Sequence, residues 1–260
     1  MESLYTKYRP QTFEQVVGQK HVVETLMRAV SEHKTSHAYL FCGPRGTGKT
    51  TMARLLAKAL MCEKGEGLPD GTCEQCRLIA AGEHPDVAEL DAASRTGVDN
   101  VRDEIISRVN YAPTMGRCKV YIIDEVHMLT TAAFNALLKT LEEPPEHVVF
   151  IMCTTDPQKV LPTILSRVQR FDFHSIAPDE MQAHLAYVCG REGFTFDDAA
   201  LDLLARLLDE VVEPRDELVV ENALFGLRLL DCSRLLGCGF ARLCRALLRG
   251  GSLCHVNPLF

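Results

Sequence analysis

The segment Gly43-Pro44-Arg45-Gly46-Thr47-Gly48-Lys49-Thr50 fits the pattern G-x-x-x-x-G-K-[ST]. It follows an apolar run, Ala38 to Cys42, and precedes a helical pattern, Thr51 to Leu60. In this strand–loop–helix context the glycines allow a tight turn that points N–H groups inward, and the helix adds its positive N-terminal end. Lys49 is then placed for the β- and γ-phosphates of a nucleotide, and Thr50 for Mg²⁺. The pattern therefore predicts a phosphate-binding loop rather than an ordinary glycine-rich turn.

A second segment, Val120 to His127, ends a β-branched and aromatic run in two adjacent carboxylates. Such a run is typical of a buried parallel strand. Asp124, at the C-terminal end of this strand, is placed to hold the Mg²⁺ of a nucleotide, and Glu125 to polarise a water for attack on the γ-phosphate. Alone, the segment would better fit a strand ending in a solvated acidic turn. Together with the phosphate loop, it indicates a nucleotide site. ATP is favoured over GTP because no Asn-Lys-x-Asp guanine-reading segment is present.

Composition indicates a soluble globular protein of 260 residues, with 47% hydrophobic and 24% charged residues. We expect neither a secretory signal nor a membrane span, and therefore a cytoplasmic protein, since no apolar run is long enough. The eleven cysteines then indicate reduced thiols or metal ligands. A net charge of −7 argues against coating nucleic acid through bulk charge, although a local DNA-contacting surface is still compatible.

The first 170 residues alternate predicted strands and helices, which favours a parallel sheet wrapped by helices with its ligand at the C-terminal strand edge. The predicted strands are 37–42, 87–91, 120–124 and 148–154. The predicted helices are 20–32, 50–61, 98–110, 130–141 and 162–168. After Phe173 the composition changes, and 181–189 and 198–208 predict two amphipathic helices with a stop near Gly193. We expect a nucleotide-binding domain over 1–174, a helical lid over 175–223 and an atypical tail over 224–260.

Several further motifs carry a resemblance to a known family. They are Tyr8–Phe13 with Val17-Gly18-Gln19, His37–Phe41, Asp91–Thr96, Ile123–Leu129, Phe134–Pro145, Thr154–Lys159 and Ser166-Arg167. Through them the chain, from about residue 4 to 206, resembles the ATPase (gamma/tau) subunits of the bacterial DNA polymerase III clamp loader, which are AAA+ proteins. The resemblance implies an α/β fold, a P-loop parallel sheet flanked by helices and followed by a small helical lid. It also implies a subunit that binds and hydrolyses Mg-ATP and loads a sliding clamp onto primed DNA.

The resemblance assigns roles to individual residues. Thr155 resembles the first sensor of the γ-phosphate, and Arg167 resembles the arginine that reaches the ATP of a neighbouring subunit, although Val168 follows it where the family commonly has Cys. Arg95 and Thr96 are placed near DNA phosphates. The nucleotide contacts implied by the motifs are Tyr8, Arg9, Pro10, Val17, Gly18, Gly43, Gly46, Thr47, Gly48, Lys49, Thr50 and Thr51. The implied partners are the other clamp-loader subunits of a hetero-oligomeric ring, the sliding clamp and primer–template DNA, with no membrane.

Cys62, Cys73 and Cys76 lie in an insertion, 62–76, and Cys73-Glu74-Gln75-Cys76 has the spacing of a zinc knuckle. The family has four cysteines here, and Asp70 stands where the second would be. Three readings remain open: a Cys₃Asp zinc site, a site with three protein ligands, or metal-free cysteines. Any zinc would be structural, because the insertion is too short to fold by core burial alone.

The resemblance weakens after residue 206. Arg215 matches the lid arginine that binds phosphate in the same chain, but Glu213 and Pro214 replace the family's small residues. The tail is free of lysine and contains four cysteines, and no counterpart of the family's collar domain is apparent. Two alternatives therefore stand beside the clamp-loader ATPase. One is a truncated or frame-shifted, non-catalytic interaction fragment, and the other is a different AAA+ DNA motor such as a branch-migration helicase.

Overall fold

The computed structural model describes residues 4–64, 68–94, 102–194, 197–199, 201–202 and 204–205. Contacts within the chain separate Arg9–Met181 from a second unit made of Met1–Tyr8 and Gln182–Phe260. The domain limits expected from the sequence remain a prediction. The second unit contains helix α1 (Leu4–Lys7) and most of helix α9 (Pro178–Glu192). Within it, Lys7 pairs with Glu192.

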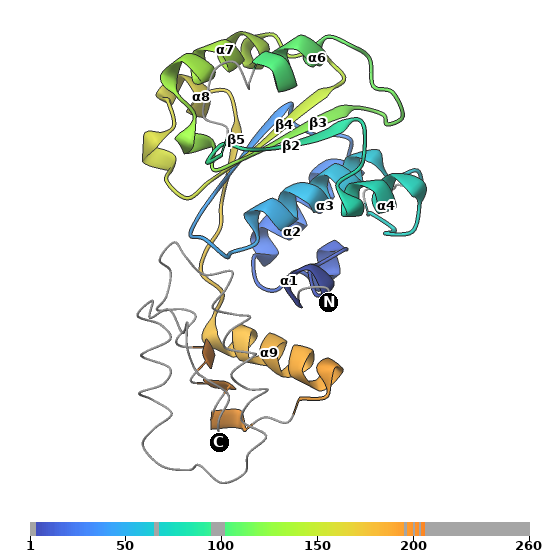
Figure 1. Ribbon diagram of the computed structural model, residues 1–260, viewed down its shortest axis with the longest axis vertical. Helices are drawn as coiled ribbons and strands as arrows, with labels where there is room; N and C mark the ends of the chain where they lie inside the picture. Colours follow the sequence, from blue (N-terminus) through green and yellow to red (C-terminus); the bar gives the residue numbers. More distant parts are fainter. Residues whose placement is uncertain are drawn as a thin grey trace, which may run out of the picture. The chain divides into compact units, whose positions relative to one another are not determined.

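Arg9–Met181 is built on five parallel strands (Figure 1). These are β1 (Ala38–Cys42), β2 (Val87–Asp91), β3 (Lys119–Asp124), β4 (Val148–Thr154) and β5 (Gln169–Asp172). Their order across the sheet is β2-β3-β4-β1-β5, and every pairing is parallel. The predicted parallel sheet is thus confirmed. Strands β1 and β4, in the interior of the sheet, are buried at every position, which explains their unbroken apolar runs.

Helices cover both faces of this sheet (Figure 1). Helices α2 (Lys20–Ser31), α3 (Lys49–Met61) and α4 (Glu74–Ala81) lie on one face, and α6 (Ser107–Val109), α7 (Thr131–Glu142) and α8 (Pro162–Leu165) lie on the other. Alternate strand residues serve the two faces, as a pleated strand requires. In β1, Tyr39 and Phe41 pack with α2 and α3, whereas Leu40 packs with α7. Short helical turns complete the unit: η1 (Phe13–Gln15), η2 (Arg102–Ile106), η3 (Val126–Met128) and η4 (Pro157–Lys159).

Several predicted elements differ from the observed ones. Strand β5 and helix α4 were not predicted. Helix α8 ends at Leu165 rather than at 168, because the chain turns to enter β5 at Gln169. Of the helix predicted over 98–110, the described part is a π-helical turn, η2, followed by α6. Helix α9 is longer than predicted, and it ends as expected before Gly193, whose φ is 74°. The predicted helix 198–208 is only partly within the described residues.

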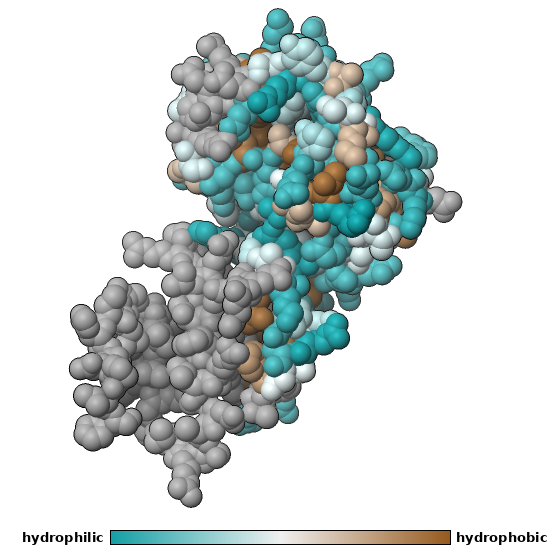
Figure 2. Space-filling model, turned by 45° about the vertical axis from the view of Figure 1, so that its right-hand side comes forward, coloured by the Kyte–Doolittle hydropathy of each residue, from teal (hydrophilic) through white to brown (hydrophobic). Residues whose placement is uncertain are grey.

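The described surface in Figure 2 is mostly hydrophilic, with apolar side chains in small separate spots. Exposed large apolar side chains, such as Tyr111 after α6 and Met128 in η3, lie in different parts of the chain. No helix in the described part of the chain combines the length and apolar character needed to cross a bilayer.

A buried polar network ties α4 to the sheet. The Asp86 carboxylate, just before β2, accepts N–H bonds from Thr114, Met115 and Gly116 at 2.7, 2.7 and 2.8 Å. The His84 Nδ1 accepts the Asp86 N–H at 3.0 Å, and its Nε2 lies 2.5 Å from Gln75 Oε1 on α4. Gln75, His84 and Asp86 are all at most 5% exposed. A buried carboxylate is stable here because its hydrogen bonds replace water.

Asp86→Asn should destabilise the protein by about 2 to 4 kcal/mol, because an amide N–H would face backbone donors in a buried site. Urea unfolding at neutral pH measures this change. Glu83→Gln, at an exposed carboxylate three residues earlier, should change stability by less than about 0.5 kcal/mol. Equal midpoints for the two variants would contradict the assigned role of the network.

The Asp86 contribution should also depend on pH. Burial alone would raise the pKa of Asp86, but the N–H groups of Gly116, Thr114 and Met115 outweigh it and lower that pKa. A folded-state pKa below the unfolded value means that the ionised carboxylate stabilises the fold above pH of about 4, and this stability is lost as pH falls through the folded pKa. The difference between wild type and Asp86→Asn should therefore be full at pH 7 and shrink in acid.

Candidate functional site

The predicted phosphate loop lies between the end of β1 and the start of α3. Gly43 begins the loop in a position where no side chain fits: a Cβ there would lie 2.4 Å from the Phe173 carbonyl oxygen and 2.8 Å from the Phe173 Cβ. The loop ends at Gly48, which caps α3 with a φ of 88°. The conformation of Gly48 is accessible chiefly to glycine. The lack of space at Gly43 and the positive φ at Gly48 therefore explain why the motif has glycine at both positions. Gly46, also at positive φ, lies between them.

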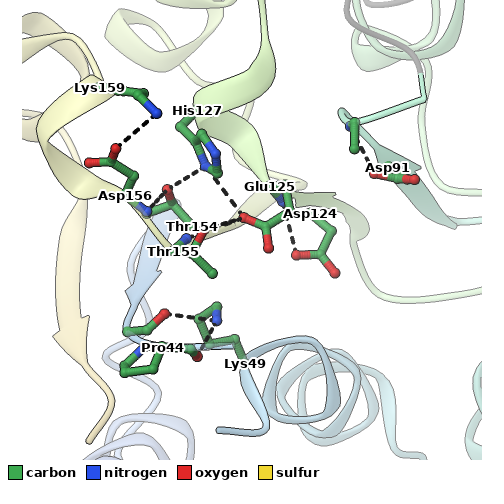
Figure 3. Close-up of polar contacts among 12 residues, drawn as sticks. Pro44, Lys49, Asp91, Asp124, Glu125, His127, Thr154, Thr155, Asp156 and Lys159 are labelled. Atoms are coloured by element: carbon green, nitrogen blue, oxygen red, sulfur yellow. Dashed lines mark hydrogen bonds and ion pairs between the residues drawn. The ribbon is translucent and has the colours of Figure 1, made fainter. Parts of the chain in front are cut away.

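Lys49, the first residue of α3, is 6% exposed and folds back over the loop. Its Nζ donates to the carbonyl oxygens of Gly43 and Pro44 at 2.9 and 2.7 Å, as Figure 3 shows for Pro44. The Thr47 hydroxyl donates to the same Pro44 carbonyl at 2.8 Å. Burial lowers the pKa of Lys49, while Glu125 and Asp124 act in the opposite direction. The lysine is therefore held inside the predicted phosphate loop by these two carbonyl groups.

The loop and the acidic end of β3 meet at Thr50. Its hydroxyl donates to Asp124 Oδ2 at 2.6 Å, across 74 positions of sequence. Strands β1 and β3 run parallel in one sheet, so their C-terminal ends lie at the same edge. The two predicted Mg²⁺ ligands are thus brought together. A hydroxyl and a carboxylate are oxygen donors of the kind that Mg²⁺ prefers, so the residues present fit this ion.

Glu125 is held at the same edge by the end of β4. Its Oε2 accepts the Thr155 N–H at 3.2 Å and the Thr155 hydroxyl at 3.0 Å, which brings the predicted base and the predicted sensor into contact (Figure 3). His127 Nδ1 lies 3.3 Å from the same Oε2 and 3.0 Å from the Thr154 hydroxyl. Glu125 has a φ of 46°, so the chain turns sharply at this residue into η3.

The residues expected around the adenine fall in both units of the chain. Tyr8 belongs to the smaller unit, where its hydroxyl donates to Glu192 Oε1 at 2.6 Å. In the larger unit, Arg9 and Pro10 line a hollow that also includes Thr51. Val17 and Gly18 precede α2. Gln19, next in the chain, exchanges hydrogen bonds with the backbone of His174, which fixes this segment to the chain beyond β5.

Arg167, expected to act on a neighbouring subunit, lies just after α8. Its Nη1 donates to the Thr163 carbonyl at 2.6 Å and to the Ser166 hydroxyl at 3.2 Å. Its Nη2 donates to Glu142 Oε1, at the end of α7, at 2.7 Å. Three other expected site residues, Arg95, Thr96 and Arg215, lie outside the described residues.

The predicted metal ligands converge. One ligand atom from each of Cys62, Asp70, Cys73 and Cys76 lies within 4.8 Å of all the others. Cys62 Sγ is 3.6 Å from Asp70 Oδ1 and 3.9 Å from Cys73 Sγ. Thiolates bound tetrahedrally at zinc's usual bond length are about 3.7 Å apart, so this spacing fits zinc.

The environment of Asp70 suits a ligand. The Thr72 hydroxyl, the Cys73 N–H and Lys64 hold the pKa of Asp70 below its usual range. The Lys64 Nζ lies 3.0 Å from Asp70 Oδ2, leaving Oδ1 as the oxygen nearest to Cys62. Zinc with three thiolates and one carboxylate would carry net negative charge, which a neighbouring lysine offsets. The donor set and its spacing therefore fit a structural zinc ion.

Two further residues contact the predicted site residues. The sequence favours His127 as a residue that packs or polarises the helix start, and in the structure it contacts Glu125 directly. Its position two residues after Glu125, at the start of a helical turn, was the available signal. Glu142 was not singled out, and its contact with Arg167, 25 positions away, left no local pattern.

Comparison with known proteins identifies relatives along most of the chain. A family model described as DNA polymerase III, delta subunit, matches residues 18–177. The chain is 50% identical to DNA polymerase III subunit gamma/tau of Mycobacterium tuberculosis over 225 residues, covering 85% of this chain and 38% of that protein. It is 52% identical to subunit tau of Escherichia coli over 204 residues, covering 78% and 32%. The chain thus spans about a third of the length of these relatives.

Solved structures share the fold. RuvB of Thermotoga maritima, described as a Holliday junction branch migration motor, superposes with a TM-score of 0.53 at 19% identity, over 76% of this chain and 59% of that one. A mutant of the same protein gives a TM-score of 0.54 at 18% identity. At this identity the likeness establishes the AAA+ fold alone.

Gly43→Ala should cost at least about 2 kcal/mol and weaken nucleotide binding, because the new methyl group collides with backbone atoms of Phe173. Urea unfolding and Mg-ATP titration measure the two effects. Gly190→Ala, inside α9 with nothing within 4 Å of the added atom, should be neutral or slightly stabilising. A Gly43→Ala variant with wild-type stability would show that the loop is held differently.

Proposed function

The chain belongs to the DNA polymerase III subunit family whose model it matches, with gamma/tau subunits as relatives, and we propose that it is an ATP-binding and ATP-hydrolysing clamp-loader subunit. The observation that carries the proposal is the Thr50–Asp124 contact at 2.6 Å, which unites the phosphate loop with the acidic end of β3. Its partners would be the other clamp-loader subunits, a sliding clamp and primer–template DNA, in the cytoplasm. Arg95 and Thr96 would contact the DNA, and Arg215 would contact phosphate in the same chain.

The residues divide the work of phosphoryl transfer. Loop N–H groups and Lys49 would bind the β- and γ-phosphates, displacing the carbonyl contacts of Lys49. Thr50 and Asp124 would hold Mg²⁺, which when bound supplies positive charge at the phosphates. Glu125 would accept a proton from the attacking water, and Thr155, hydrogen-bonded to Glu125, would report the presence of the γ-phosphate. Arg167 would stabilise charge on the nucleotide of a neighbouring subunit.

Mg-ATP titration of the purified chain tests the nucleotide site. Wild type should bind, and Lys49→Ala should bind about 10- to 100-fold more weakly, because charge-assisted hydrogen bonds to phosphate are lost. Glu125→Gln should bind ATP but lower hydrolysis by the assembled complex by about 10² to 10⁴-fold. Lys34→Ala, on an exposed lysine paired with Glu32, is the matched control. Failure of wild type to bind would favour a non-catalytic interaction module.

We propose in addition that Cys62, Asp70, Cys73 and Cys76 bind a structural zinc ion, a proposal supported by their convergence. Zinc measured by atomic emission after dialysis against a chelator should be near one equivalent. Asp70→Ala should weaken zinc binding at least roughly tenfold, and Asp70→Cys should tighten it, since a thiolate is the softer ligand. Cys118→Ser, outside the cluster, should leave the zinc content unchanged. Wild type that retains no zinc after this dialysis, and whose thermal midpoint does not rise when zinc is added, would refute the proposal.

A further inference from the structure

The guanidinium of Arg167 is engaged by its own chain on two sides. Nη1 bonds the Thr163 carbonyl, in the last turn of α8, and Nη2 bonds the Glu142 carboxylate. The Arg167 and Glu142 side chains are 32% and 49% exposed, so the pair lies at the surface. An anion that approached this surface would find the arginine already occupied by a carboxylate.

The backbones that carry the pair are fixed. Leu141, beside Glu142, is buried in the same apolar cluster as Ile164, which lies in α8 three residues before Arg167. The two helix ends are therefore held against one core while the charged side chains remain at the surface. Thermal motion of the side chains alone can then break and remake the ion pair, without movement of either helix.

Glu142 is an unfavourable residue for its position. It is the last residue of α7, where the helix dipole is negative and a cation would be preferred. The unfavourable interaction of Glu142 with the helix dipole is offset by its ion pair with Arg167. Glu143, the next residue, carries the same charge and is exposed, and within the described residues no hydrogen bond of its carboxylate is found. The chain thus offers a built-in matched control.

We propose that Glu142 is a positioning residue that occupies Arg167 in the unassembled chain and competes for it with the phosphate of a neighbouring subunit's nucleotide. This inference rests on the proposed function, which places Arg167 at that phosphate. No covalent step is involved: the guanidinium exchanges a carboxylate partner for a phosphate partner. Exposed ion pairs are weak, so the competition should amount to about two- to fivefold, which a doubly or triply charged phosphate can overcome.

The first experiment measures the pair in the isolated chain. Phenylglyoxal modifies accessible guanidinium groups, and mass spectrometry of the peptide that contains Arg167 gives its rate. Glu142→Gln, which keeps the shape of the side chain, should raise this rate about two- to fivefold, and Glu143→Gln should not. Equal rates in wild type and Glu142→Gln would overturn the proposal whatever the ATPase does.

The second experiment measures hydrolysis in the complex assembled with the other clamp-loader subunits. Glu142→Gln should lower the KM for ATP, or raise the rate at low ATP, about two- to fivefold, and the effect should vanish in an Arg167→Ala background. A lower rate, or the same effect with Arg167→Ala, would overturn the proposal, since a purely structural role would act without the arginine. If Lys49→Ala hydrolysed ATP as fast as wild type, the proposed function itself would have failed, and this inference with it. If wild type, Glu142→Gln and Glu143→Gln hydrolysed ATP at equal rates, the proposed competition for Arg167 would be overturned, and the proposed function would stand.

Discussion

The whole site depends on the close approach of three strands at Gly43. The Gly43 N–H bonds the Thr154 carbonyl at the end of β4, and its Cα faces the carbonyl of Phe173 beyond β5. Any side chain at Gly43 would collide with Phe173 and push apart the segments that carry the loop, Thr155 and the chain beyond β5. Because β1 lies between β4 and β5, the loop that follows it is fixed by both neighbours. The geometry of the phosphate loop is therefore a property of the sheet and not of the loop alone.

Polar groups at this edge of the sheet are hydrogen-bonded to one another. Lys49 is bonded to loop carbonyls, Thr50 to Asp124, and Glu125 to Thr155. Each group is buried or half-buried, and leaving it without a partner would cost more than its bond contributes. Under the proposed function, Mg-ATP would replace these contacts with its own. Its binding energy would then be coupled to the release of Asp124 from Thr50 and of Glu125 from Thr155.

The sequence was informative where structure is dictated locally. Apolar runs predicted β1, β3 and β4, and the spacing of Gly43, Gly48 and Lys49 predicted the loop. Strand β5 was missed because only Phe171 of its four residues is buried, so it has no apolar run. Helix α4 was missed because Cys73 and Cys76, at its N-terminal end, were interpreted as metal ligands. Contacts between distant positions depend on how the elements pack, as for Thr50 with Asp124 and Arg167 with Glu142. In the sequence, neither residue of such a pair indicates which residue it will contact.

Buried and exposed polar contacts have different consequences in this chain. Asp86 and His84 are sealed in a network that joins α4, and with it the cysteine cluster, to the sheet. Breaking that network would leave buried polar groups without partners, so the network holds α4 in a fixed position on the sheet. The Glu142–Arg167 pair is exposed, and water can replace either partner at little cost, so it suits exchange. A chain whose site is joined by buried and half-buried contacts, and whose Arg167 is held by exposed ones, keeps its internal geometry fixed while its surface remains free to change partners.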